Sequence, residues 1–462
     1  METEQVFLLL VFAVAILATL KEPAVRVGRR RIALDYGLAP PLAVALLAAA
    51  GYITPAVLRD ALLGINGLVP WEVLVIFFGG AYICMCIDQT GVLDYVSSRI
   101  IRMSGGDGPR LYGGLVALTA VLTVFTSNDI ITLTMTPLIC YMARYARINP
   151  IPYLIAVFFT SNTWSMIFYI GNPPNIIVAQ AFRLGFLEYA RLMALPSVVS
   201  GVATAGLVYL VFRQEIRQRI ALRADLGLAS LPRPIAAIAN VVAFGLFFAL
   251  LALSEHIGLT VWKTVTLFSV IFLGLNLVFS FGPTLPRTKA AGSAKHTFAI
   301  THFLEPLRRV PWKMLPLILS FFIIIQLFTV HGLTDLLARG LSRLGGLWSG
   351  TLLTGYLSAI SSNLMINQPA TILFANAMQN AQFTLTGTER LASGLALIVG
   401  TNLGGNITLF GALAGLMWSK ILAHYGVEMS YGRFLRISIR VMPLAILVTL
   451  LTIALQMQLL WD

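Results

Sequence analysis

Short polar clusters interrupt apolar stretches at four places, and their residue types could bind a small solute or an ion. Asparagine and threonine supply neutral oxygen ligands and amide donors, and glycine lets the backbone approach a solute closely. If the clusters converge, we predict one site for substrate and coupling ion. The alternative is that they only cap broken helices and hold helices together. In chain order the clusters comprise Ser127, Asn128, Asp129 and Thr132; Asn162, Thr163, Gly171, Asn172 and Asn175; Ser362, Asn363, Asn367 and Thr371; and Asn402, Gly404, Gly405, Asn406 and Thr408.

Asp129 is the only acid within these clusters. An ionisable residue at membrane depth is a functional candidate by default. We therefore predict that Asp129 binds the coupling proton or another coupling ion, with helix capping as the alternative. For Asp88 and Asp94, which lie near the end of another apolar stretch, capping or structural pairing is the favoured interpretation.

The composition indicates an integral membrane protein. Of 462 residues, 58% are hydrophobic and only 11% are charged, whereas a soluble domain carries roughly a quarter charged residues. Successive apolar runs approach the ~20 residues needed to cross a bilayer. The net charge of +13 resides in short basic clusters between these runs, as the positive-inside rule predicts, so no nucleic acid partner is expected.

Chain reversals inside the membrane follow from the spacing of the charges. Arg110 and Arg144 are both expected in the cytoplasm, and the 33 residues between them are too few for two crossings, which need about 40. This spacing predicts a re-entrant hairpin with its tip at residues 126–129. Two adjacent prolines, Pro173 and Pro174, predict that the next crossing is broken in its middle.

The two halves of the chain share a sparse internal repeat. Pro70-Trp71 matches Pro311-Trp312 at an offset of 241, and Asn162 matches Asn402 at 240, whereas Ser127-Asn128 aligns with Ser362-Asn363 at 235. The predicted fold is an all-α integral membrane protein with inverted repeats of about five crossings each, each with a re-entrant hairpin and a discontinuous helix. This arrangement is typical of secondary transporters. The predicted divisions are an N-terminal repeat at 1–213, a cytoplasmic linker at 214–234 and a C-terminal repeat at 235–462, with a further mobile cytoplasmic linker at 283–311.

Enzymatic chemistry is not expected. The sequence has no nucleotide-binding glycine loop and no zinc-type histidine spacing, so we predict neither a catalytic residue, nor a cofactor, nor a metal site. Cys84 and Cys86 lie two residues apart on a predicted helix and so do not share a face, which argues against a three-thiol site with Cys140.

Several of these runs resemble a known family. The run TSNDIITLTMTPLICYMAR and the later runs IGNPPNIIVAQ, SSNLMINQPATIL and GTNLGGNITLFGALAG resemble the ArsB/NhaD branch of the ion transporter superfamily, closest to arsenite/antimonite efflux permeases. The resemblance covers most of residues 71–212 and 312–447. It implies arsenite or antimonite export from the cell in exchange for protons, in the inner (plasma) membrane, with substrate held between the hairpins and the broken helices.

The resemblance also assigns individual residues and partners. It carries the family's asparagine–aspartate pair onto Asn128 and Asp129 and its second-hairpin asparagine onto Asn367. A second copy of the chain and a soluble ATPase are candidate partners. Two other functions remain open: a sodium-coupled anion (dicarboxylate-like) symporter or sodium/proton antiporter, and a passive channel or membrane subunit of a pump.

Overall fold

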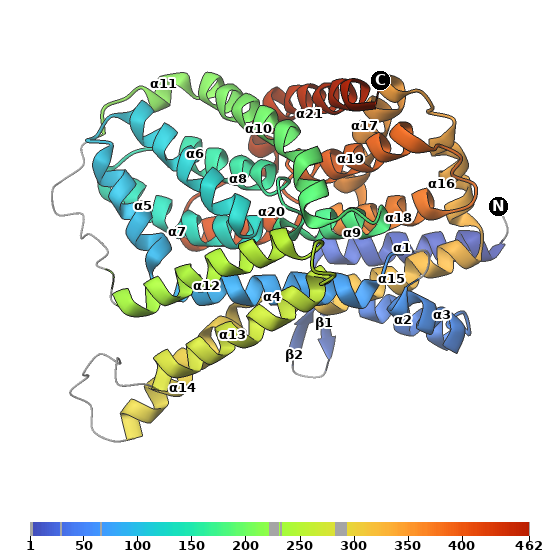
Figure 1. Ribbon diagram of the computed structural model, residues 1–462, viewed down its shortest axis with the longest axis horizontal. Coiled ribbons are helices and arrows are strands. Elements are labelled where there is room, and N and C mark those ends of the chain that lie inside the picture. Colours follow the sequence, from blue (N-terminus) through green and yellow to red (C-terminus); the bar gives the residue numbers. More distant parts are fainter. Residues whose placement is uncertain are drawn as a thin grey trace.

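The computed structural model describes residues 3–27, 30–64, 67–220, 231, 233–281 and 293–461, and these residues form mainly helices (Figure 1). Eight of the described helical segments are long and apolar enough to cross a membrane, which agrees with the predicted all-α membrane fold. The helices of the first half are α1 (Thr3–Lys21), α2 (Ala39–Ala49), α3 (Pro55–Leu63), α4 (Pro70–Gln89), α5 (Val92–Met103), α6 (Gly108–Phe125), α7 (Asn128–Ala146), α8 (Ile151–Trp164), η1 (Tyr169–Gly171), α9 (Pro173–Ala181), α10 (Phe186–Val211) and α11 (Arg213–Ile216). Those of the second half are α12 (Pro234–Leu253), α13 (Val261–Phe281), α14 (Ser293–Arg309), α15 (Met314–Val330), α16 (Leu333–Ser342), α17 (Leu347–Met365), α18 (Asn367–Gln379), α19 (Gly387–Gly404), α20 (Leu413–His424) and α21 (Tyr431–Trp461).

A small β-hairpin forms the one sheet among the described residues. Strands β1 (Ala24–Val27) and β2 (Arg30–Ala33) pair antiparallel between α1 and α2. No residue pattern in the sequence predicted this hairpin. Arg26 and Arg31 are exposed on it, and the positive-inside rule therefore places this end of the protein on the cytoplasmic side.

Two helical hairpins carry two of the polar clusters. In the first, α6 ends at Phe125 and α7 begins at Asn128, so the chain reverses over two residues where the charge spacing predicts the tip. In the second, α17 and α18 are separated only by Ile366, which adopts a left-handed backbone with φ of 70°. Figure 1 shows the two hairpins in opposite halves of the molecule.

Two broken crossings carry the other two clusters. The first consists of α8, the short η1 turn and α9, and the adjacent prolines Pro173 and Pro174 occupy the first two positions of α9. These are the positions where a helix tolerates proline, because the missing N–H would have no partner within the helix. The second consists of α19 and α20, with the break between Gly404 and Leu413.

The packing pairs elements from the two halves in a matched way. Helix α7 packs on α20, and α18 packs on α9; both α5 and α16 follow a left-handed glycine, Gly91 and Gly332. An inverted repeat predicts such pairs, although the division at residues 213 and 235 stays a prediction. The structure corrects one sequence alignment: Asn367, not Asn363, begins the helix that matches α7, at an offset of 239 from Asn128.

The two segments predicted as linkers differ in their structure. Most of the first lies outside the described residues, and its beginning forms α11 before Ile220 N–H donates to the carbonyl of Gly106. The second is not an extended linker over its whole length. Residues 293–309 form the helix α14, which packs on α4 and α13, while the preceding residues 282–292 lie outside the described part.

Candidate functional site

The first asparagine network joins the first hairpin to both broken crossings. Asn128 Nδ2 donates to Asn162 Oδ1 at 2.6 Å, and Asn162 Nδ2 donates to Asn406 Oδ1 at 2.8 Å. All three side chains are at most 1% exposed. Beside them the hydroxyls of Thr132 and Ser161 lie 2.8 Å apart. Because Asn406 follows Asn162 by 244 positions, the network crosses between the two halves.

This first network is incompletely satisfied. Asn128 Oδ1 and Asn406 Nδ2 are buried and have no hydrogen-bond partner in the described part of the chain. Buried polar atoms in folded proteins almost always have partners, and an orphaned one costs about 1–3 kcal/mol. An acceptor and a donor are therefore both available here to a small polar solute.

The second asparagine network also joins the two halves, but more of its amide atoms have hydrogen-bond partners. Asn172 Nδ2 donates to Asn402 Oδ1 at 2.7 Å, and Asn402 Nδ2 donates to Asn175 Oδ1 and to the carbonyl of Ile398, both at 2.8 Å. Asn175 Nδ2 in turn donates to the carbonyl of Ser165 at 2.8 Å. Within the described residues, no amide atom of these three asparagines is both buried and unpartnered.

Asn363 ties the second hairpin to the second broken crossing. Its Nδ2 donates to the carbonyl of Gly404 at 2.7 Å, and its Oδ1 accepts from the N–H and the hydroxyl of Thr408 at 3.0 and 2.7 Å. A Cβ at Gly404 would lie 2.4 Å from Ala359 Cα on α17, so only glycine permits this close approach. Gly411, which the sequence analysis did not single out, has the same role: a Cβ there would lie 2.7 Å from Asn363 Oδ1.

Asp129 lies in the first turn of α7, beside Asn128, and is 5% exposed. No described cation forms an ion pair with it, and it accepts no described hydrogen bond from another side chain. A carboxylate in the first turn of a helix is favoured by the helix dipole. That stabilisation is partial, and binding of a proton or a cation by this carboxylate stays a prediction.

The remaining predicted residues divide into two groups. The hydroxyls of Thr163, Ser362 and Thr371 each donate to the backbone carbonyl four residues earlier, so they support helices. Ser127 and Gly405 lie buried at the tip of the first hairpin and at the second break, and Gly171 is buried in η1, where a Cβ would lie 2.5 Å from the Ser165 carbonyl.

At the tip of the second hairpin, Asn367 Oδ1 and Gln368 Oε1 are buried and unpartnered within the described chain. Gln368 is the second residue of α18, as Asp129 is of α7, and the sequence analysis missed it. The matched position in the repeat could have identified it, had the hairpins been aligned at the correct offset.

The described residues form no metal centre, because no three of their His, Cys, Asp or Glu side chains lie close together. Cys84, Cys86 and Cys140 are buried free cysteines. The donors at the centre are amides and hydroxyls, which suit hydrogen bonding to an uncharged solute better than they suit a transition metal.

Comparison with known proteins gives the family. A family model described as citrate transporter (CitMHS) matches residues 32–392. The chain belongs to this family. It is 28% identical over 401 residues to an arsenical pump membrane protein of Escherichia coli, covering 84% of this chain and 87% of that one. A putative arsenical pump membrane protein of Bacillus subtilis is 23% identical over 390 residues, covering 79% of this chain and 83% of the relative.

A solved structure supports the fold. The chain is similar to the YdaH transporter of Alcanivorax borkumensis, with a TM-score of 0.58, 16% identity and coverage of 99% and 98% of the two chains. The protein is therefore a multi-pass membrane transporter related to the ArsB group, as its sequence motifs indicate.

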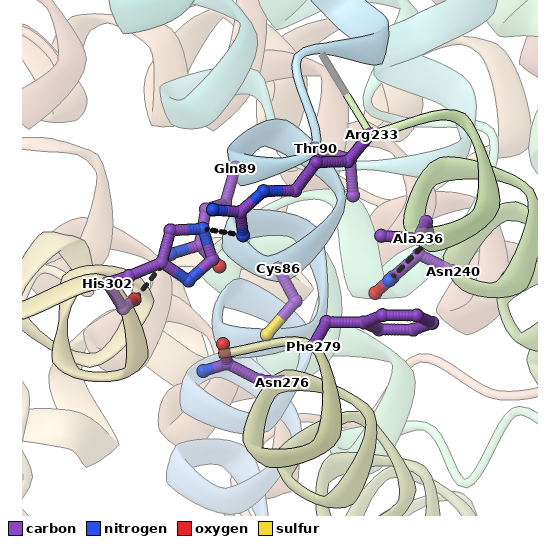
Figure 2. Close-up of a pocket in the computed structure, with 9 residues that line it drawn as sticks. All are labelled: Cys86, Gln89, Thr90, Arg233, Ala236, Asn240, Asn276, Phe279 and His302. Atoms are coloured by element: carbon purple, nitrogen blue, oxygen red, sulfur yellow. Dashed lines mark hydrogen bonds between the residues drawn. The ribbon is translucent and has the colours of Figure 1, made fainter. Parts of the chain in front are cut away.

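A separate polar pocket of this citrate-family transporter is lined by residues of α4, α12, α13 and α14 (Figure 2). Arg233 lies 2.7 Å from His302 Nε2, and Gln89 Nε2 donates to the His302 carbonyl. Nearby, Arg309 of α14 forms an ion pair with Asp88, which confirms the structural pairing predicted for that acid. The pocket holds only about 20 Å³, so we assign it to the docking of α14 and not to transport.

Proposed function

We propose that this protein exports trivalent arsenic or antimony, as the neutral hydroxide, in exchange for protons. The observation that carries the proposal is the first asparagine network. Within the part of the chain that the structure describes, an acceptor on Asn128 and a donor on Asn406 lack partners, and the adjacent carboxylate of Asp129 has no counter-charge. A neutral solute with hydroxyl groups both donates and accepts hydrogen bonds, and it needs no counter-charge.

The charge balance at the centre supports a neutral substrate. No Lys or Arg side chain of the described residues hydrogen bonds to Asn128, Asn162 or Asn406. A citrate-like anion in a buried site would require cationic partners to offset its desolvation. The arsenical pump relatives agree with this choice, although the family description names citrate.

The proposed cycle uses Asp129 as the proton carrier. With the site open to the outside, the carboxylate takes up a proton; with the site open to the cytoplasm, it releases that proton and the substrate binds. The two hairpins and two broken crossings, which we propose belong to inverted repeats, would move the site between these states. Asn128 links the two events, because it neighbours Asp129 and offers its free oxygen to the substrate.

The test is flux in everted membrane vesicles, whose cytoplasmic face is outward. We expect arsenite to accumulate inside when the interior is acidified, and accumulation to stop when an ionophore collapses the proton gradient. Uptake that follows a sodium gradient, or accumulation of citrate and not arsenite, would replace the proposal with the anion symporter. Arsenite movement that only equilibrates would indicate a channel.

A further inference from the structure

An open cleft lies between the first broken crossing and the helices around it. It has a volume of about 460 Å³ and is lined by Glu72 of α4, Gln180 of α9, Tyr169 of η1 and residues between α12 and α13. Gln180 Nε2 donates to Glu72 Oε2 at 3.2 Å across it. Tyr169 lies two residues before Gly171, so the cleft reaches the break that carries Asn172. The cleft borders the loop that follows α12. Because α12 runs outward from the basic cytoplasmic linker, the positive-inside rule places this loop and the cleft on the outer side.

The matched positions in the second half each form an ion pair with an acid near the N-terminus. At the repeat offset of about 240, Glu72 corresponds to Lys313 and Gln180 to Lys420. Lys420 Nζ, on α20, lies 2.7 and 2.8 Å from the two carboxylate oxygens of Glu22. Lys313 Nζ lies 2.6 Å from Asp35 Oδ2. The first pair ties the second broken crossing to the end of α1, and the second joins the segments that begin α15 and precede α2.

Tyr36 directly follows Asp35 in the loop between β2 and α2, and its side chain packs, partly buried, against the core. Burial raises the pKa of Tyr36 to about 12, with further contributions from the charges of Asp35, then Asp129, then Glu22. The charges of Glu22 and Asp129 therefore both act on the Tyr36 hydroxyl. Helix α20, which carries Lys420, packs on α7, which carries Asp129.

The backbone at Glu22 is itself unusual. Its φ is 43°, a left-handed conformation, and its N–H donates to the Ala18 carbonyl at the end of α1. Glycine is the usual residue here because it has no Cβ to strain. Strained non-glycine residues cluster at functional sites. The side chain of Glu22 forms the ion pair with Lys420.

We propose that Glu22, Lys420 and Tyr36 form a cytoplasmic gate that closes the path to Asp129, while the Glu72–Gln180 cleft is the open outer vestibule. The inference rests on the proposed function, since it assigns the two access routes of that site. Lys420 and Glu22 are 59% and 23% exposed, so the pair is weak enough to break in every cycle. Movement of α20 away from α1 would separate the charges and uncover Tyr36.

The gate can be tested by the access of a reagent to the hairpin tip. Cys84, Cys86 and Cys140 are replaced by alanine, and Thr126→Cys places one thiol at the buried tip beside Asp129. A membrane-impermeant maleimide is then added to everted vesicles. We expect Glu22→Gly, which removes the carboxylate and keeps the left-handed backbone unstrained, to raise the labelling rate at least about fivefold, and Lys420→Gln to do the same. Tyr36→Ala should also raise it, and Tyr36→Phe should not.

Two controls separate a gate from general loosening. The swapped pair Glu22→Lys with Lys420→Glu should return the rate towards the parent. Arg59→Gln should leave the rate unchanged, because the Arg59–Asp60 ion pair on α3 involves neither the broken crossing nor Tyr36. Unchanged labelling in both single variants, or an equal rise in Arg59→Gln, would overturn the gate. The labelling uses neither arsenite nor a proton gradient, so it can succeed or fail independently of the proposed function.

Discussion

The two asparagine networks at the centre of the protein differ in how many of their polar atoms have partners. Asn402 makes three side-chain hydrogen bonds, and it connects Asn172 and Asn175 across the two halves. The network of Asn128, Asn162 and Asn406 crosses the halves in the same way, yet one oxygen and one nitrogen in it find no partner among the described residues. We therefore propose different roles for two networks of the same residue type: the satisfied one holds the halves together, and the unsatisfied one binds the solute.

The largest expected effect comes from Asp129→Asn. Asparagine has nearly the same shape but cannot carry a proton, so we expect arsenite accumulation against its gradient to fall to the level of empty vesicles. The thermal melting temperature in detergent should stay close to the parent, because no ion pair is lost. Uphill transport at the parental rate would refute the role of Asp129.

The comparison of the networks is sharpest in a matched pair, Asn402→Ala and Asn406→Ala. Removing the Asn402 side chain leaves buried amide atoms of Asn172 and Asn175 without their partner, and we expect the free energy of unfolding to fall by about 1–3 kcal/mol. Removing Asn406 takes away one hydrogen bond and the free donor, so we expect a smaller loss of stability and a higher KM for arsenite. Melting curves and flux at varied substrate concentration measure the two effects. If the two variants behave alike in both measurements, the distinction between the networks is wrong.

Gly404→Ala tests the packing that brings the second crossing to the second hairpin. The added methyl group would collide with the α17 backbone at Ala359, and we expect a loss of about 1–3 kcal/mol, seen as a lower melting temperature. Gly432→Ala is the control, because a Cβ there meets nothing within 4 Å. Equal melting temperatures for the two variants would contradict the close approach.

The smallest effect is expected for Thr408→Val. The variant loses the hydroxyl bond to Asn363 Oδ1 but keeps the backbone N–H bond to the same atom. We expect a loss of about 1 kcal/mol or less and no change in KM. A large increase in KM would mean that Thr408 belongs to the binding site and not to the fastening of the hairpin.

Local signals allowed the breaks to be predicted. The tandem prolines Pro173-Pro174 break a helix through backbone geometry. The spacing between Arg110 and Arg144 is too short for the membrane thickness. Neither signal requires knowledge of the packing. The partners of each asparagine could not be predicted in this way. Whether Asn162 pairs with Asn406 or with Asn402 depends on how helices more than 200 residues apart in the chain pack together.

Similar residue types at two positions also produced an incorrect alignment of the two hairpins. Ser127-Asn128 and Ser362-Asn363 read alike, but α17 continues to Met365 and keeps Asn363 within the first arm of its hairpin. The helix after the tip begins at Asn367 instead. For the segment at 283–311, polar composition suggested a linker, whereas α14 gains its helical structure by packing on α4 and α13, a tertiary effect.

Asp129 has no counter-charge among the residues that the structure describes, and for the proposed exchange this has an electrical consequence. If a neutral solute leaves while one proton enters, each cycle carries one positive charge inward, and the membrane voltage adds to the pH difference as a driving force. A potential of 100 mV contributes about 2.3 kcal/mol per charge, which corresponds to roughly 50-fold in accumulation. A cell could then expel the solute even where the medium is no more acidic than its cytoplasm.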